Sequence, residues 1–445
     1  MVKIPVSGPT LRDLLHDRDL VSELRRILTS GAGPEVNGRY YHWDKLRHLD
    51  PPDGLTTREW WLALKFARAS LAKPIALLDK TGAPFTFSMT DTVFQAIHRI
   101  DRDASGKIEI SEQVTSPATR DRYIISSLML EAITSSQLEG AVTTIERAKD
   151  LIRTGRKPSD QSEQMVLNNY LAMRSVRQFT HERLTPERIL ELQKIVTADT
   201  LDDPDAAGRL RRREDDVVVS DFDGEILHRP PDASELEERL DRMCAFANGK
   251  DGDAFVHPVV RAVLLHFWVG YDHPFVDGNG RTARALFYWS MLSQGYWLCE
   301  YISISTRLRS QPAKYARSYL HTETDENDLT YFLLHQLGII RRAIDELHVH
   351  LDGKMEEVRR VEALLRQAVV LNQRQLALLS HSLKHPNSRY SIRSHRNSHN
   401  VVYQTARSDL LDLAERGLLN RRKVGRTFYF YPKPDLADRL KRLEA

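Results

Sequence analysis

Cysteine is scarce in this sequence, since only Cys244 and Cys299 occur among its 445 residues. Two thiols are too few for a disulfide framework or a four-thiolate zinc site, and their scarcity favours a reducing compartment. No run of about 18 apolar residues is present, and residues 1–15 carry prolines and charges where a signal peptide needs an apolar core. We therefore expect a cytoplasmic protein that does not contact a membrane.

The sequence also lacks a strong overall charge. The 64 Lys and Arg residues are nearly balanced by 61 Asp and Glu, which leaves a formal net charge of +3. This balance is typical of a soluble globular protein without a general preference for polyanions, so any basic surface must be local. A chain of this length has room for about two or three domains of ordinary size.

Helical periodicity dominates the sequence, because apolar residues recur three and four positions apart in many segments. Strand patterns are few, and the clearest is the hairpin predicted from Asp216 to His228, where Val217, Val218 and Val219 precede an Asp-Phe-Asp-Gly turn. A second hairpin is predicted at Arg421 to Tyr431. The predicted helices cover Thr57–Ala72, Ile124–Leu138, Val166–Val176, Pro186–Ala198, Ala233–Ala247, Val259–Tyr271 and Thr282–Ser293.

These patterns predict a mainly α protein with four regions. Residues 1–120 form an N-terminal helical region, and residues 121–345 form a compact helical block that contains the motif described next. Residues 346–371 are expected to be a connecting helix, with apolar positions from Asp345 to Val370. Residues 372–445 form a small basic domain.

The segment from His273 to Arg284 lies between two predicted helices and is rich in glycine and arginine. Gly278 and Gly280 permit backbone angles that point successive N–H groups into one concavity, and the next helix begins there with the positive end of its dipole. Such a loop is suited to binding an anion. Arg281 lies three positions before Arg284, so both guanidinium groups can contact the same bound group.

Two further side chains in this loop supply chemistry. Asp277 offers a hard oxygen ligand suited to Mg²⁺, which prefers one or two carboxylates together with substrate phosphates. His273 is the one side chain in the loop whose ordinary pKa lets it accept a proton near neutrality. The combination indicates attack on a phosphate ester of a nucleotide.

Two other phosphate-binding motifs are excluded. The spacing of Gly278, Gly280 and Ala283 satisfies the dinucleotide-binding pattern, but that pattern requires a preceding strand where Val259–Tyr271 is predicted helical. A P-loop requires Gly-Lys-Ser or Gly-Lys-Thr, which the loop does not contain.

The twelve residues match every fixed position of His-x-Phe-x-Asp/Glu-Gly-Asn-Gly-Arg-x-x-Arg, so the sequence resembles the Fic-domain proteins. The resemblance implies a helical fold with a small hairpin flap, and transfer of AMP from ATP to a Ser, Thr or Tyr hydroxyl of a target protein. The roles that it implies are a base for His273, a structural anchor for Phe275, Mg²⁺ binding for Asp277, α-phosphate binding for Asn279 with Gly278 and Gly280, and contacts to the β- and γ-phosphates for Arg281 and Arg284.

The hairpin around Val217, Val218 and Val219 falls where members of this family carry a flap that aligns the target as an added strand. Main-chain pairing of this kind does not depend on the target's side chains. An ordinary edge hairpin remains the alternative.

Ser135 to Gly140 matches the inhibitory motif Ser/Thr-x-x-x-Glu-Gly/Asn of Fic proteins. Gly140 is expected to end one helix, and a capping box at Thr143 and Glu146 to begin the next. In this interpretation Glu139 pairs with Arg284 and occupies the position of the γ-phosphate, while Ser135 orients the helix.

Two rival functions stay open. In the reverse reaction, Glu139 would position a water molecule that removes AMP from a modified protein. Alternatively, the Fic block of a DNA-binding regulator would only sense a nucleotide, although a sensor does not need the base His273.

Asp101 to Glu112 has the spacing of an EF-hand calcium loop. Pro117 falls only five residues later, where it would interrupt the required exit helix, and no partner loop follows. We therefore expect an ordinary turn or hairpin.

From Asn372 onwards, fifteen Lys and Arg residues face six Asp and Glu. The order of an apolar helix, a short polar helix, a further helix and a basic hairpin resembles a winged helix-turn-helix. Such domains bind DNA or other proteins, and the DNA contacts would come from Gln404, Thr405, Arg407, Arg421, Arg422 and Lys423. The expected ligands and partners are thus ATP, Mg²⁺, a target protein that could be the chain itself, DNA, and a second copy of the chain in a homodimer.

Overall fold

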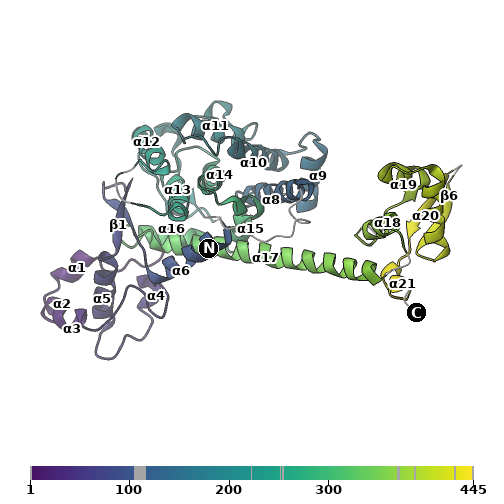
Figure 1. The fold of residues 1–445 in the computed structure, drawn as a ribbon. Helices are drawn as coiled ribbons and strands as arrows, with labels where there is room; N and C mark the ends of the chain where they lie inside the picture. Colours follow the sequence, from purple (N-terminus) through teal and green to yellow (C-terminus); the bar gives the residue numbers. More distant parts are fainter. Residues whose placement is uncertain are drawn as a thin grey trace. The chain divides into compact units, whose positions relative to one another are not determined.

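The computed structural model describes residues 3–104, 117–221, 223–250, 252, 255–367, 371–384, 387–424 and 427–442. The chain divides into two compact units, Met1–Leu347 and His348–Ala445 (Figure 1). Each unit has its own apolar core. The division falls within helix α17, Thr330–Gln367. This helix begins fifteen residues earlier than the connecting helix predicted from Asp345, because its first turns bury apolar residues such as Phe332 and Leu333 in the first unit.

The N-terminal part of the first unit combines short helices with one β-hairpin. Helix α5 is its central element, and it begins with a capping box in which Thr56 and Glu59 satisfy each other's backbone N–H groups. Trp60, Trp61 and Leu64 of α5 are buried in the local core. The elements are α1 (Leu11–His16), α2 (Arg18–Ser22), α3 (Leu24–Leu28), α4 (Trp43–Leu46), α5 (Thr57–Ala69), β1 (Ala72–Leu78), β2 (Pro84–Ser88) and α6 (Asp91–Ala104).

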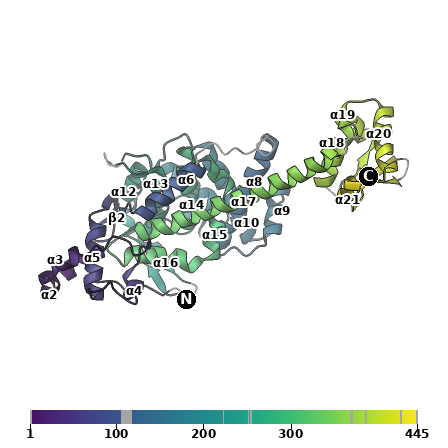
Figure 2. The same ribbon diagram turned by 60° about the horizontal axis from the view of Figure 1, so that its bottom comes forward.

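The central part of the first unit is a helical block built around α14. Helices α8, α10, α11 and α13 all contact α14. Figure 1 shows these helices in one block, and Figure 2 shows α8, α10, α13 and α14 from another side. The elements are α8 (Pro117–Leu138), α9 (Ile145–Thr154), α10 (Gln161–Gln178), α11 (Pro186–Thr197), β3 (Val219–Ser220), β4 (Ile226–His228), α12 (Leu236–Ala247), α13 (Pro258–Asp272), α14 (Asn279–Ser293), α15 (Ile304–Ser310) and α16 (Pro312–Glu323).

The prediction of a mainly helical fold is confirmed, and each predicted helix is present with shifted ends. One detail of a predicted helix end was wrong. Thr144 rather than Thr143 caps α9, since its side chain accepts the N–H of Arg147. Helix α8 begins at Pro117, where a first-turn proline lacks only an N–H that has no intrahelical acceptor. Residues 105–112 of the calcium-loop pattern lie outside the described residues.

The predicted hairpin at Asp216–His228 is present but shorter than expected. Strand β3 begins at Val219, which pairs with His228 of β4, so Val217 and Val218 lie outside the ladder. The reason lies at Asp216, which caps a 3₁₀ turn in the left-handed conformation (φ 38°) and redirects the chain just before the valines.

The hairpin of β1 and β2 was not predicted. Lys73 and Pro74 interrupt the alternation of apolar and polar residues that signals a strand. Contacts distant in sequence hold the hairpin instead, since Arg239 of α12 donates to the carbonyl oxygens of Leu78 and Asp79.

The second unit contains helices and a three-stranded antiparallel sheet of order β5-β7-β6. Leu378, Leu379, Leu410, Leu413 and Phe430 lie in its core. The elements are α17 from residue 348 onwards, α18 (Gln373–Lys384), β5 (Tyr390–Ser391), α19 (Ile392–His399), α20 (Tyr403–Glu415), β6 (Leu419–Val424), β7 (Thr427–Pro432) and α21 (Leu436–Arg442).

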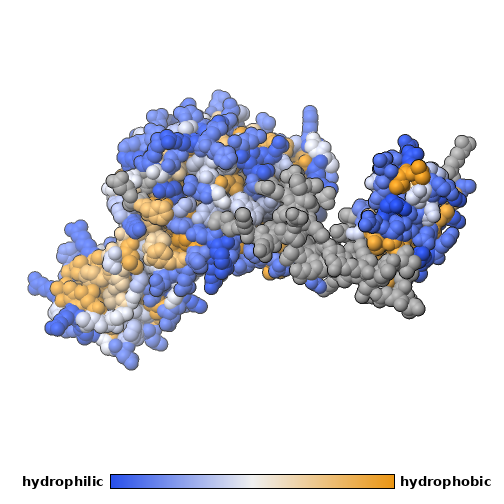
Figure 3. Space-filling model, viewed as in Figure 1, coloured by the Kyte–Doolittle hydropathy of each residue, from blue (hydrophilic) through white to orange (hydrophobic). Residues whose placement is uncertain are grey.

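No helix within the described residues is both long enough and apolar enough to cross a membrane. Figure 3 shows a largely hydrophilic face over the helical block, with more hydrophobic surface over the N-terminal helices. The exposed apolar side chains of that N-terminal stretch are Ile4, Val6, Leu15, Val21 and Leu28.

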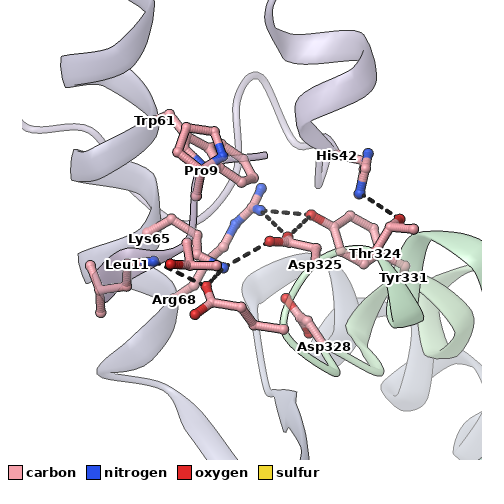
Figure 4. A network of polar contacts seen from close by, with 12 residues as sticks. Pro9, Leu11, His42, Trp61, Lys65, Arg68, Thr324, Asp325, Asp328 and Tyr331 are labelled. Carbon is pink, nitrogen blue, oxygen red and sulfur yellow. Dashed lines mark hydrogen bonds and ion pairs between the residues drawn. The ribbon is translucent and has the colours of Figure 1, made fainter. Parts of the chain in front are cut away.

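A buried polar network joins the N-terminal part to the corner between α16 and α17 (Figure 4). Lys65 Nζ lies 2.8 Å from Asp325 Oδ1, and the Tyr331 hydroxyl donates to Asp325 Oδ2 at 2.6 Å. Arg68 donates to the Tyr331 hydroxyl and lies over the ring of Tyr40. Burial alone raises the pKa of Asp325, but the two cations outweigh it and hold that pKa below its ordinary value.

We expect Asp325→Ala to lower the free energy of unfolding by about 3–5 kcal/mol, because the substitution leaves Lys65 and Arg68 buried without their common carboxylate. Glu326 offers a matched control, since it also pairs with Lys65 but is 38% exposed. Glu326→Ala should cost about 0–1 kcal/mol. Denaturant unfolding of both variants tests the network, and equal losses would contradict it.

Candidate active site

The predicted anion-binding loop connects α13 to α14. Pro258 occupies the first turn of α13, where its missing N–H costs nothing, and the helix ends at Asp272. His273 then adopts the left-handed conformation (φ 44°, ψ 57°) while its N–H still bonds to the Val269 carbonyl oxygen. A non-glycine residue pays a conformational cost in this region, so the surrounding structure must hold His273 in place.

Arg211 supplies much of that support. Its Nε donates to the His273 carbonyl oxygen at 2.8 Å, and its Nη2 donates to the carbonyl oxygens of Pro231 and Asp272. Its backbone N–H bonds to the Pro274 carbonyl oxygen at 2.9 Å. One buried arginine therefore fixes the start of the loop and ties it to the segment that follows the hairpin.

Asp272, the last residue of α13, supports the loop through two buried contacts. Its Oδ1 lies 3.1 Å from Arg239 Nη1, and its Oδ2 accepts the indole N–H of Trp268 at 2.8 Å. Burial raises the pKa of Asp272 to about 6, although Arg239 opposes the shift. Because Arg239 also bonds to β1, the unpredicted hairpin takes part in supporting the loop.

The Asn279 side chain closes the loop into a ring. Its Oδ1 accepts the N–H of Phe275 at 2.9 Å, and its Nδ2 donates to the Phe275 carbonyl oxygen at 2.8 Å. The Phe275 ring is fully buried. In this structure the Asn279 amide is therefore engaged by the loop itself, and a phosphate would meet mainly backbone N–H groups.

Gly278 and Gly280 are needed for two different reasons. Gly278 has φ 82°, and a Cβ there would lie 2.8 Å from Thr197 Cγ2. At Gly280, a Cβ would collide with the carboxylate of Glu139. The first turn of α14 leaves the N–H groups of Asn279, Gly280 and Arg281 without intrahelical acceptors.

Arg281 anchors the loop to α11. Its guanidinium group is fully buried, with Nη1 donating to the Val196 carbonyl oxygen and Nη2 lying 2.8 Å from Asp277 Oδ2. The other carboxylate oxygen of Asp277 accepts the N–H of Gly278. Asp277 itself is 48% exposed, so it remains open to a ligand.

Arg284 is buried and held by the end of α8. Its Nε donates to Ser135 Oγ at 2.8 Å, and its Nη2 donates to the Ser135 carbonyl oxygen and to Glu139 Oε1, the latter at 2.7 Å. Burial alone lowers the pKa of Arg284, but Glu139 outweighs it and leaves that pKa above its ordinary value. The structure thus brings Ser135, Glu139 and Arg284 together as the sequence motif predicts.

His273 has one ring nitrogen engaged and one available. Its Nδ1 lies 3.3 Å from the Gly270 carbonyl oxygen, which can accept only if Nδ1 carries the proton. The lone pair then lies on Nε2. Burial lowers the pKa of His273 to about 4, so the ring is neutral and able to accept a proton at pH 7.

His273, Glu139, Gly280 and Arg284 line one cavity of about 200 Å³. Val219 and Leu227 of the hairpin form another part of its wall, as do Tyr271, Tyr315, Tyr319 and Leu320. Among the predicted flap residues only Val219 lines the cavity, whereas Val217 and Val218 precede it. The six predicted DNA-contacting residues belong to the second unit.

His228 fastens the hairpin beside the cavity. Its Nε2 lies 2.7 Å from the Tyr271 carbonyl oxygen, and its Nδ1 lies 2.6 Å from Glu323 Oε2 at the end of α16. The hairpin is therefore attached to both α13 and α16.

The residues of the loop suit a magnesium ion whose remaining coordination positions are filled by phosphate oxygens. Within the described ranges, no group of three or more His, Cys, Asp and Glu side chains could hold a metal alone. Asp277 is a single, half-exposed carboxylate beside orphaned helix N–H groups, and Mg²⁺ typically takes one or two carboxylates plus phosphate oxygens.

Several residues of the site were not predicted from the sequence. Arg211, His228, Glu323 and Tyr315 act through contacts that span tens of residues. The sequence offered one indication, because Pro230-Pro231 marks the end of the hairpin. It does not identify Arg211 as the residue that bonds to this segment.

Part of this chain is similar to known proteins. Residues 183–291 match the Fic/DOC family. A protein adenylyltransferase Fic of Nematostella vectensis is 30% identical over 168 residues, and one of Drosophila melanogaster is 29% identical over 202 residues. These alignments cover 36% and 44% of this chain, and each covers 37% of the relative's length.

The fold agrees with that of a solved Fic family protein from Desulfovibrio desulfuricans G20, with a TM-score of 0.55 at 20% identity. The match covers 77% of this chain and 97% of the other. Residues 183–291 are thus similar to the Fic/DOC family, and part of the chain is similar in sequence to proteins named protein adenylyltransferase Fic.

We predict that His273 titrates near pH 4 instead of its ordinary value of 6.5. The unfolded chain takes up this proton near pH 6.5, so the group lowers the stability of the folded state progressively as pH falls from about 6.5 to 4. Imidazole NMR signals followed against pH, with His273→Gln to assign the resonance, measure the midpoint. A midpoint near 6.5 would show that the surroundings of His273 do not lower the pKa of its ring.

Proposed function

We propose that this protein transfers AMP from ATP to a Ser, Thr or Tyr hydroxyl of a target protein, and that Glu139 restrains this activity. One observation carries the proposal: His273 lines the same cavity as the buried Arg284 and its partly exposed partner Glu139, beside the first turn of α14. The relationship of the Fic domain to protein adenylyltransferases supports the same reaction.

In the proposed reaction, His273 Nε2 takes the proton of the target hydroxyl as its oxygen attacks the α-phosphorus. The bond from that phosphorus to the bridging oxygen breaks, and pyrophosphate leaves. Positioning and neutralisation of charge account for most of the rate in such reactions. The N–H groups of Asn279, Gly280 and Arg281 would receive the phosphate oxygens at the positive end of α14.

The metal and the hairpin complete the proposed arrangement. Asp277 would hold Mg²⁺, which would neutralise phosphate charge when bound. Residues of β3 and β4 would align the target's backbone, because the hairpin has an edge beside the cavity and main-chain pairing tolerates many sequences.

The proposed restraint follows from charge and space. The Glu139 carboxylate disfavours binding of a γ-phosphate at Arg284 in two ways. It occupies the guanidinium group, and its negative charge repels the triphosphate. Ser135 contributes through two contacts that hold Arg284 against the helix end.

We expect Glu139→Gly to increase AMP transfer by roughly 5–150-fold, the range of typical couplings between two states. Radiolabelled ATP with cell lysate measures transfer and identifies the labelled protein. Glu146→Gly is the matched control, since it removes an exposed carboxylate of α9 that does not contact Arg284.

The double variant Glu139→Gly with His273→Ala should bind ATP but transfer no AMP, because the base is missing. Activity in this variant would refute the mechanism. If Glu139→Gly adds no AMP but no longer removes AMP from a modified target, the reverse reaction is the correct function.

For the second unit, we propose a winged helix-turn-helix that binds duplex DNA. The order α19, a short turn and α20 supports this interpretation, as does the β6–β7 hairpin with its exposed basic residues. Gln404 and Arg407 are exposed on α20, whereas Thr405 is half-buried. Neighbouring residues alternate along β6, so Arg421 and Lys423 share one face and Arg422 lies on the other.

The full chain should therefore bind duplex DNA with an affinity that falls steeply as salt rises. Arg421→Ala combined with Arg422→Ala should reduce the slope of log affinity against log salt by about 1–2, according to whether one or both contact phosphates. Arg439→Ala, which removes an arginine already paired with Asp435, should leave the slope unchanged. Absence of binding at low salt would instead identify the unit as a protein-interaction module.

A further inference from the structure

A groove of about 370 Å³ lies between α6 and α17 in the first unit, apart from the cavity at His273. Its walls come from three segments far apart in sequence: the turn at residues 38–40, one face of α6 and one face of α17. Each wall contributes one arginine, namely Arg39, Arg99 and Arg341.

These three arginines have no carboxylate partner among the residues that the structure describes. Arg39 makes one long contact, 3.5 Å to the Tyr41 hydroxyl. Many other surface arginines of this chain are paired, for example Arg188 with Glu182 and Arg416 with Asp412.

Three unpaired guanidinium groups around one groove favour an anion as their common partner. The positive charge of Arg341 also affects the next residue of α17. The pKa of Arg342 is lowered by burial and by the neighbouring Arg307 and Arg341. His335 in the groove adds no charge at neutral pH, because burial lowers its pKa to about 4.

Hydrogen bonds join two walls of the groove to each other. Glu35 accepts the hydroxyls of Thr90 and Thr92, and the Thr92 hydroxyl also reaches the Gly38 carbonyl oxygen at 3.4 Å. The turn at Gly38 is thereby fixed to the start of α6. On the opposite wall, a Cβ at Gly338 would meet only the ends of the Arg342 side chain, at 3.9–4.0 Å.

We propose that this groove binds a phosphate-bearing small molecule at a site separate from the Fic motif. Guanidinium forks are suited to phosphate oxygens, which they bind with two parallel hydrogen bonds. The volume lies within the range of small-molecule sites, about 300–1,000 Å³. Tyr40, Leu334 and Leu337 supply an apolar surface on which a ring could lie.

Hydrogen exchange of the full chain tests the site directly, with inorganic tripolyphosphate and GTP as separate probes. Bound probe should slow exchange of peptides covering residues 36–40, 92–99 and 334–341 by roughly 10–100-fold at about 10–100 times the Kd. Protection by tripolyphosphate shows that the phosphates suffice, and protection by GTP alone shows that the ring is also needed. Either result supports the proposal.

Variants separate this groove from the motif loop. Arg99→Ser with Arg341→Ser should abolish protection in the groove peptides while residues 273–284 still respond to the probe. Gly338→Leu should do the same by filling the groove without removing a charge, since position 338 has ordinary helical geometry.

Arg153→Ser, which removes an exposed arginine of α9, is the control and should leave protection unchanged. Protection confined to residues 273–284, or unaltered protection in both groove variants, would overturn the proposal. Because the readout is local exchange, neither result depends on AMP transfer.

Discussion

The buried guanidinium group of Arg284 is the constraint on which the site depends. A cation removed from water needs a negative partner, and the partner in this structure is Glu139, supported by Ser135. That requirement fixes the end of α8 against the first turn of α14 and makes Gly280 necessary, because any side chain there would displace the carboxylate. A triphosphate offers the same guanidinium group a competing anion, so the proposed substrate and the proposed inhibitor meet at one side chain.

The N-terminal part contributes to the same geometry from outside the helical block. Arg239 links the hairpin of β1 and β2 to Asp272, immediately before His273. Lys65 and Arg68 hold the corner that follows α16, and α16 ends with Glu323, the partner of His228 on the hairpin. The N-terminal region therefore supports two walls of the cavity.

The sequence predicted the parts of the site that are local. The spacing of the fixed residues within 273–284 was enough to identify the loop. Helical periodicity located the flanking helices within a few residues. What it missed depends on distant partners. Arg211 lies 62 residues from the carbonyl oxygen that it holds, and β1 contains Lys73 and Pro74, which conceal its strand pattern. Val217 and Val218 were predicted to belong to a strand and do not. Their strand propensity contains no information about the left-handed turn at Asp216, which redirects the chain before them.

The ring that Asn279 closes with Phe275 has a consequence for the thermodynamics of ligand binding. A free loop of this length would lose conformational entropy when it wraps around a phosphate, at roughly 1–2 kcal/mol per residue ordered. Here the loop is ordered during folding by the Asn279 amide, the Arg211 guanidinium group and the buried Phe275 ring. Binding then requires little further ordering, so more of the contact energy is available for affinity and for stabilising a transition state.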